Sequence, residues 1–242
     1  MKGKIERLQG DSWSAGVFAP ENPAAQPLPL IVMNLSDPAG LEPLLPELKR
    51  KMGKEMRPAY LAALDGSDWN RDYSPWPAPP LRPGEAPFPG GAPQRLRLLT
   101  EQVLPSLRAH YPICETPEDT GIFGYSLGGL AALYMAYESP EFGLVGCLSG
   151  SLWYEGFMPW AESRRLASPR ARVYLSLGRK EEKTRNPYLC KIGDCYRQLE
   201  AHLRKQLGEE HITMTWHDGG HATEVPHRML LGLETLLKTP AL

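Results

Sequence analysis

Two hydrophobic patterns alternate along the chain. Short apolar runs bounded by glycine, proline or polar residues predict buried strands. Longer segments with apolar residues every three or four positions predict helices. The predicted strands lie at 13–20, 27–36, 57–66, 121–123, 143–151, 172–178 and 212–220. The predicted helices lie at 40–52, 93–111, 127–137, 196–208 and 224–237.

Strands that alternate with helices of this length predict an α/β fold. We expect one mostly parallel central sheet with helices on both faces, in three layers, and a single domain over 1–242. In such sheets the functional loops follow the carboxyl ends of the strands. Candidate chemistry is therefore sought where predicted strands end.

One segment, residues 67–93, breaks this alternation. It reads "SDWNRDYSPWPAPPLRPGEAPFPGGAP" and is too rich in proline and glycine for a regular element. Loops of this length in compact domains are commonly functional or disordered. Its aromatic residues indicate that the first half is ordered and wraps the domain. The second half, from Pro77 to Pro93, is expected to be a surface cover or a flexible arm.

Composition excludes several classes of protein. The 242 residues are 42% apolar and 23% charged, as in soluble globular enzymes, and the net charge of −1 offers no basic field for nucleic acid or anionic membranes. The first residues show no signal peptide and no apolar run reaches the length of a membrane span, so a cytoplasmic location is expected. The four cysteines match no zinc or redox motif, and free thiols are expected.

The stretch "DTGIFGYSLGGLAALYMAYESPEFG" places Ser126 on a turn between a buried strand and a helix. Gly124 and Gly128 flank it in the Gly-x-Ser-x-Gly pattern of a nucleophile elbow, in which a strained serine needs neighbours without a Cβ. The N–H of Leu127 then lies at a helix N-terminus, where an oxyanion would be stabilised. The plain alternative is that glycine and serine fill an ordinary loop.

A nucleophilic serine needs a base, and the base needs an acid to orient it. In α/β-hydrolases these partners follow in the order serine, acid, histidine. His221 is the predicted base, because "HDGGHATEV" follows a strand and precedes the last helix. His217 ends that strand and is read as structural, and the glycines at 219 and 220 argue against a helical metal pair of the two histidines. Glu181 is the predicted acid, three residues after Gly178, with Glu182 as the second choice.

With this order the chain resembles the putative esterase family of α/β-hydrolases, which includes esterase D, enterochelin esterases and related siderophore esterases. "GYSLGGLAALYMAYESPEFG", "CLSGSLWY" and "GGHATEV" carry the resemblance, which covers most of the chain. The resemblance supports Glu181 as the acid. The early strand in this family ends in an aspartate–glycine pair, whereas this chain has "NLSDPAG", where the N–H of Leu35 is the expected second oxyanion donor.

The resemblance also implies a substrate-binding region. "DWNRDYSPWPAP" resembles the loop that borders the acyl pocket in these esterases, and residues 69–93 are expected to cover the active-site side. The residues expected to bind substrate are Trp69, Arg71, Trp76, Tyr125 and Trp153.

The sequence thus predicts a serine esterase that acts on a small-molecule ester, of siderophore type or with a small acyl group, without a metal or organic cofactor. An acyltransferase with the same triad, a serine peptidase of the prolyl oligopeptidase type and a non-catalytic binding protein of the same fold remain alternatives. The oligomeric state is open.

Overall fold

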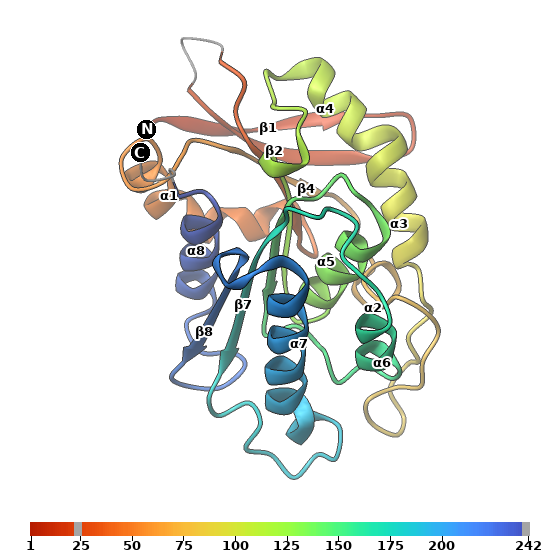
Figure 1. The fold of residues 1–242 in the computed structure, drawn as a ribbon. Helices are drawn as coiled ribbons and strands as arrows, with labels where there is room; N and C mark the ends of the chain where they lie inside the picture. The colour runs from red at the N-terminus through yellow and green to blue at the C-terminus, as the bar shows by residue number, and fades with distance from the viewer. Residues whose placement is uncertain (22–25, 239–242) are drawn as a thin grey trace.

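A single eight-stranded sheet runs through the molecule (Figure 1). The structure is a computed structural model that describes residues 1–21 and 26–238; positions 22–25 and 239–242 of the expected domain lie outside this part. In spatial order the strands run β1-β2-β4-β3-β5-β6-β7-β8. Their bounds are β1 Gly3–Gln9, β2 Ser14–Pro20, β3 Leu30–Asn34, β4 Tyr60–Leu64, β5 Thr120–Tyr125, β6 Leu144–Leu148, β7 Arg172–Gly178 and β8 Ile212–His217.

The sheet is parallel from β4 to β8 and antiparallel at its other edge, where β2 pairs with both β1 and β4. The prediction of a mostly parallel sheet is therefore confirmed. Strand β1 was not predicted from the sequence. Its short run "GKIERLQ" is half-exposed along most of its length, so it shows only a weak apolar signal.

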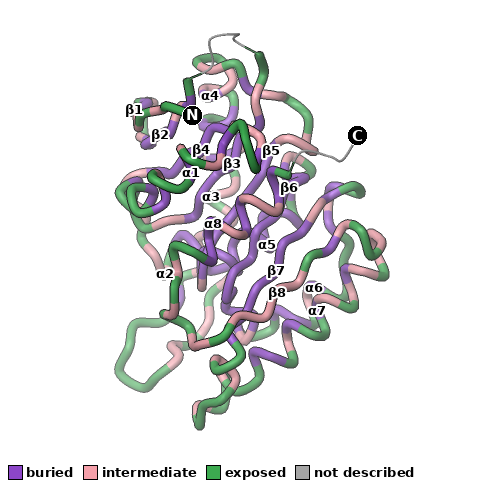
Figure 2. Tube along the Cα trace, turned by 90° about the vertical axis from the view of Figure 1, so that its left-hand side faces the viewer, coloured by how far each residue is buried: buried purple, intermediate pink, exposed green. Residues whose placement is uncertain are grey.

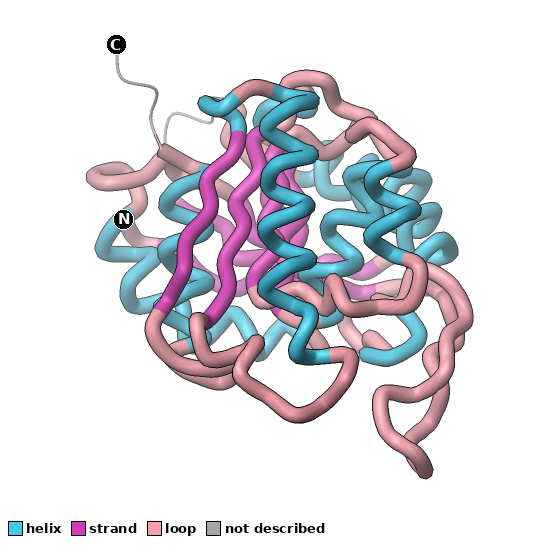
Figure 3. Tube along the Cα trace, turned by 60° about the horizontal axis from the view of Figure 1, so that its bottom comes forward, coloured by secondary structure: helices cyan, strands magenta, loops and turns pink. Residues whose placement is uncertain are grey.

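Helices cover both faces of the sheet, as predicted (Figure 3). One layer consists of α1 and α8 with a short 3₁₀ helix, and it packs on strand residues such as Ile31, Leu61 and Phe123. The other layer contains α3 to α7 and packs on residues such as Val32 and Ile122. The helix bounds are α1 Leu45–Lys51, α2 Trp69–Asp72, α3 Ala92–Leu98, α4 Leu104–His110, α5 Leu127–Glu138, α6 Phe157–Glu162, α7 Ile192–Leu207 and α8 Val225–Leu236.

Proline divides two of the predicted helices. The segment predicted as a helix over 40–52 is a 3₁₀ helix, Pro38–Leu44, followed by α1. The helix predicted over 93–111 contains a π-helical turn, Leu99–Val103, between α3 and α4. Pro105 has no N–H to donate to the carbonyl four residues earlier, and a π turn is one way in which a helix accommodates that loss.

Helix α5 lies at the centre of the molecule, and all residues from Leu127 to Tyr137 are buried (Figure 2). A helix that is apolar on all sides is typical of a protein core. It begins directly after β5, so its N-terminus and Ser126 are held at the carboxyl end of the central strands. The loops 77–91 and 179–191 extend from this same end of the sheet (Figure 1).

The long segment 67–93 is ordered by its own contacts. Ala78 and Phe88 pair through two backbone hydrogen bonds of 3.0 and 2.9 Å, and Phe88 is buried. Trp76 donates from Nε1 to the carbonyl of Glu155 at 2.9 Å. The two backbone bonds therefore close the second half of the segment into a loop, and the expectation that residues 69–93 cover the active-site side stays a prediction.

Candidate active site

Ser126 occupies a strained turn between β5 and α5. Its φ of 57° and ψ of −125° are unusual for a residue with a side chain. A Cβ on Gly124 would lie 2.3 Å from the carbonyl carbon of Gly128, and one on Gly128 would lie 2.6 Å from the carbonyl oxygen of Asn34. Both positions therefore require glycine, for the reason that the sequence motif predicts.

His221 lies beside the serine. Its Nε2 is 3.2 Å from Oγ of Ser126, and its Nδ1 is 2.7 Å from Oε2 of Glu181. The histidine is on the loop between β8 and α8, where Gly219 takes a φ of 107°. Tyr125 donates from its hydroxyl to the carbonyl of His221 at 2.5 Å, which anchors the backbone of this loop.

Glu181 is almost fully buried, with 6% of its side chain exposed. Its Oε1 accepts hydrogen bonds from Oγ of Ser149 at 2.6 Å and from the N–H of Gly178 at 2.8 Å. Burial by itself would raise the pKa of this carboxyl. The hydrogen bonds from His221, Ser149 and Gly178 outweigh burial and lower its pKa, so the carboxylate form is favoured.

The structure brings together two further residues that the sequence analysis did not identify, Ser149 and Arg228. Arg228 is 1% exposed and donates from Nη2 to Oγ of Ser149 at 2.6 Å and from Nη1 to the hydroxyl of Tyr125 at 2.7 Å. Both of its terminal nitrogens lie 3.5 Å from Oε1 of Glu181. The buried guanidinium of Arg228 therefore lies on the side of the Glu181 carboxylate opposite His221.

Only weak sequence signals mark these two residues. Ser149 follows β6 in "CLSGS", at a strand end where functional residues gather, and it takes a positive φ of 43°. Arg228 is a cation within the apolar pattern of the last helix. Nothing in that pattern shows which residue it contacts.

The titratable residues next to Glu181 and His221 in the sequence have other partners or surroundings. Glu182 forms an ion pair with Arg197 at 3.0 Å instead of contacting His221. Asp218 is exposed and lies 3.9 Å from Arg179. Burial lowers the pKa of His217, and the nearby Arg228 adds to this effect. The structure thus places Glu181, and not Glu182, against the imidazole.

The expected oxyanion donors differ in their environment. The N–H of Leu127 opens α5 and so lies outside the ladder of bonds within the helix. The N–H of Leu35 donates to the carbonyl of Met33 at 3.0 Å, and the carbonyl of Leu35 accepts from the hydroxyl of Tyr73 at 2.7 Å. Leu35 N–H is therefore engaged within the chain in this conformation.

A mainly apolar cavity of about 240 Å³ opens beside Ser126 and His221. Its remaining lining residues are Leu81, Ser149, Ser151, Trp153, Glu181, Leu189 and Ile192. Leu81 brings the long segment 67–93 to this cavity, and Leu189 and Ile192 bring the loop and helix after β7.

Of the five residues expected to bind substrate, Trp153 alone lines this cavity. Trp69 and Tyr125 line a separate hollow of about 390 Å³ that also includes Leu35. The ring of Trp76 packs among aromatic residues, 6.0 Å from Tyr154 and 5.5 Å from Trp160 between ring centroids. Arg71 pairs with Asp72 and lines a third pocket. Residue type in the long segment did not show which side chains face Ser126.

No group of three or more histidine, cysteine, aspartate or glutamate residues within 1–21 and 26–238 could hold a metal ion. Across the same residues, no helix is both long and apolar enough to span a membrane. The expected cytoplasmic location stays a prediction.

Known proteins resemble this chain in sequence and in fold. Residues 13–225 match the family described as putative esterase. An uncharacterized protein of Bacillus subtilis, YbbA, is 28% identical over 144 residues, which are 59% of this chain and 53% of the relative. The match therefore spans about half the length of that curated relative.

Two solved structures share the fold. An IroE-like serine hydrolase from Shewanella oneidensis aligns with a TM-score of 0.76 at 16% identity, over 98% of this chain and 80% of the other. The enterobactin esterase FES from Shigella flexneri aligns with a TM-score of 0.72 at 21% identity, over 98% of this chain and 58% of the other.

The strand order and these neighbours show that the chain has an α/β-hydrolase fold. The chain belongs to the putative esterase family, because the match to that family covers most of its length.

Proposed function

We propose that the protein is a serine esterase in which Ser126, His221 and Glu181 form the catalytic triad. The continuous chain of contacts from Oγ of Ser126 through His221 to Glu181, with distances of 3.2 and 2.7 Å, carries this proposal. These are the contacts that general-base activation of a serine hydroxyl requires.

In the proposed reaction, Oγ of Ser126 attacks the ester carbonyl while Nε2 of His221 takes the hydroxyl proton. Glu181 holds the Nδ1–H and stabilises the imidazolium that forms. The negative oxygen of the tetrahedral intermediate lies at the N-terminus of α5, where the N–H of Leu127 is the proposed donor. His221 then gives its proton to the leaving alcohol.

Water completes the cycle. His221 takes a proton from a water molecule, which attacks the acyl carbonyl on Ser126. His221 then returns the proton to Oγ of Ser126 as the acyl–oxygen bond breaks and the carboxylic acid leaves. A second N–H at the oxyanion requires the Leu35 peptide to give up its bond to Met33 when substrate binds. Removing one such donor in other enzymes costs about 10²–10³ in rate.

The cavity beside Ser126 points to the substrate class. Its volume of about 240 Å³ and its walls of Leu81, Trp153, Leu189 and Ile192 suit a small acyl group or one aromatic arm. The likeness to FES, a structure determined in the presence of enterobactin, makes a siderophore-type ester the natural large substrate to test.

The decisive experiment combines labelling with a substrate series. A fluorophosphonate probe should label wild-type protein and not Ser126→Ala, and p-nitrophenyl esters of increasing chain length should be cleaved alongside a triscatecholate siderophore. Absence of labelling and of cleavage of every ester would overturn the proposal in favour of a non-catalytic binding protein. Transfer of the acyl group to added alcohols, in preference to water, would identify an acyltransferase.

A further inference from the structure

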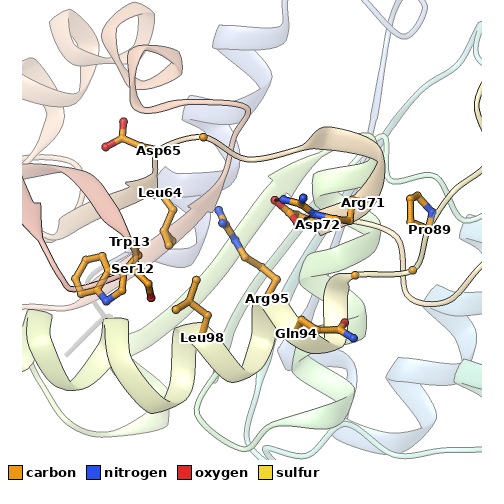
Figure 4. A pocket seen from close by; sticks show the side chains of 13 residues that line it. Ser12, Trp13, Leu64, Asp65, Arg71, Asp72, Pro89, Gln94, Arg95 and Leu98 are labelled. Carbon is orange, nitrogen blue, oxygen red and sulfur yellow. Dashed lines mark hydrogen bonds and ion pairs between the residues drawn. The ribbon is translucent and has the colours of Figure 1, made fainter.

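A pocket larger than the one beside Ser126 lies elsewhere in the described chain. It has a volume of about 580 Å³ and lies between the β1–β2 turn, the end of β4, helix α2 and helix α3 (Figure 4). Trp13, Leu64 and Leu98 contribute apolar walls. None of its lining residues also lines the Ser126 cavity. This hollow, called here the Arg95 pocket, is of the size that small-molecule sites have.

A buried arginine lies in the wall of the pocket. Arg95 is 8% exposed, and its side chain rises from α3 between Leu64 and Asp72 (Figure 4). Its Nη2 donates to Oγ of Ser67 at 2.6 Å and lies 3.5 Å from the hydroxyl of Tyr73. Its Nε is buried without a hydrogen-bond partner. Within the described residues no carboxylate comes within 4.0 Å of this guanidinium.

The two carboxylates that line the same pocket already have partners. Asp72 accepts from Nε and Nη2 of Arg71 at 2.7 and 3.2 Å. Asp65 accepts from Oγ of Ser14 at 2.5 Å and pairs with Arg7 at 2.6 Å. Arg95 therefore has no carboxylate partner among the described residues, and its guanidinium lies over the ring of Tyr73, 5.7 Å from the ring centroid. Buried charges in proteins are ordinarily paired or bound to a ligand, because an unpaired one is costly.

We propose that the Arg95 pocket binds a small organic anion, with a carboxylate or phosphate group against Arg95 and an apolar body against Trp13, Leu64 and Leu98. Nη1 of Arg95 makes no hydrogen bond to the described residues, so it is the nitrogen left free to bind the anion. Guanidinium groups form strong hydrogen bonds with both kinds of anion.

The pocket also has a physical connection to the proposed active site. Nη2 of Arg95 bonds to Ser67, whose Oγ lies 3.3 Å from the hydroxyl of Tyr73. That hydroxyl donates to the carbonyl of Leu35, beside the expected oxyanion donor. An anion on Arg95 therefore contacts the residue network that fixes this loop, without entering the cavity beside Ser126.

Direct binding measurements test the proposal independently of any esterase activity. Titration calorimetry of the full chain would compare benzoate and phenyl phosphate with benzyl alcohol, which has the ring without the charge. Benzoate and phenyl phosphate should bind at one site, and benzyl alcohol should not. The tighter of the two anions identifies the natural ligand as a carboxylate or a phosphate.

Three variants locate the site. Arg95→Met should weaken anion binding at least about tenfold, the effect of losing one charge-assisted hydrogen bond. Gln94→Glu adds a negative charge at an exposed lining position, cannot disturb the core, and should weaken binding about threefold. Arg97→Gln, an exposed neighbour on α3, should leave binding unchanged.

Several results would overturn the proposal. These are absence of anion binding, equal binding of benzyl alcohol, or unchanged affinity in both Arg95→Met and Gln94→Glu. If Arg95→Met loses its circular dichroism signal, the comparison of Gln94→Glu with Arg97→Gln decides alone.

Discussion

Both terminal nitrogens of Arg228 lie 3.5 Å from Oε1 of Glu181, in surroundings that leave 2% of one side chain and 6% of the other exposed. Oε1 faces Arg228, Ser149 and the backbone of Gly178, and this leaves Oε2 for His221. The buried guanidinium of Arg228 therefore fixes the orientation of the Glu181 carboxylate from the side opposite His221.

Arg228→Met should destabilise the protein by about 3 kcal/mol, because removing one partner of a buried pair leaves the other charge uncompensated. Urea unfolding followed by circular dichroism measures this change. Arg197→Gln is the matched control, because Arg197 is exposed and pairs with Glu182. Loss of its guanidinium should lower the free energy of unfolding by less than about 1 kcal/mol. Equal losses in the two variants would contradict the role assigned to burial.

Ser126→Ala should abolish ester hydrolysis while the fold stays intact. Loss of the nucleophile lowers kcat by about 10⁶ where this has been measured. Steady-state kinetics on a p-nitrophenyl ester, with circular dichroism as the control for folding, measures the effect. Retained activity with an unchanged spectrum would show that the nucleophile is another residue.

His221→Ala should be as damaging as Ser126→Ala, and the double variant should be little worse than either single one, because triad members act as a unit. His217→Ala is the control from the same loop region and should be much milder, since His217 is a partly buried residue of β8 rather than a contact of Ser126. Equal losses from the two histidines would require a different base or a bound metal, which a metal assay would distinguish.

Glu181→Gln should lower kcat by about 10²–10⁴, because the amide cannot stabilise the imidazolium charge. Glu182→Gln should change kcat less than about threefold, since Glu182 forms an exposed pair with Arg197. The ratio of the two kcat values measures the difference. A larger effect at Glu182 would reverse the assignment, and no effect at either position would indicate a Ser–His dyad.

The lowered pKa of Glu181 also predicts how stability depends on pH. A carboxyl whose pKa is lower in the folded state contributes stability above its unfolded pKa and loses it as the pH falls through the folded value. The difference in Tm between wild type and Glu181→Gln should therefore shrink as the pH falls below the ordinary value of 4.5. Thermal unfolding from pH 7 downward measures it, and a difference that grows in acid would contradict the sign.

The sequence was sufficient for features that depend on local pattern. Ser126 is marked by glycines that its turn requires, and His221 by its place after the last strand. Glu181 follows from chain order and from its spacing after Gly178. Ser149 and Arg228 could not be found in this way, because they meet Glu181 only once β6, β7 and α8 are packed together.

The same distinction applies to the substrate residues that the family resemblance implies. Trp76 packs in an aromatic cluster and Arg71 pairs with Asp72, away from the cavity beside Ser126, and their part in substrate binding stays a prediction. Proline changes the type of helix within a predicted segment, as in the π turn before Pro105. Tertiary packing decides which side chains of the long segment face the cavity, and a single sequence does not show it.

Strand β8 is an edge strand that pairs only with β7 in the described sheet, and only Ile212 of its six residues is buried. Edge elements with little buried surface open at a lower free energy than the core. Since His221 is carried by the loop after β8, fraying of this one strand is enough to part the base from the nucleophile. Heating should therefore abolish activity at a lower temperature than the one at which the protein unfolds. Cooling a sample that has lost activity but kept its circular dichroism signal should restore the activity.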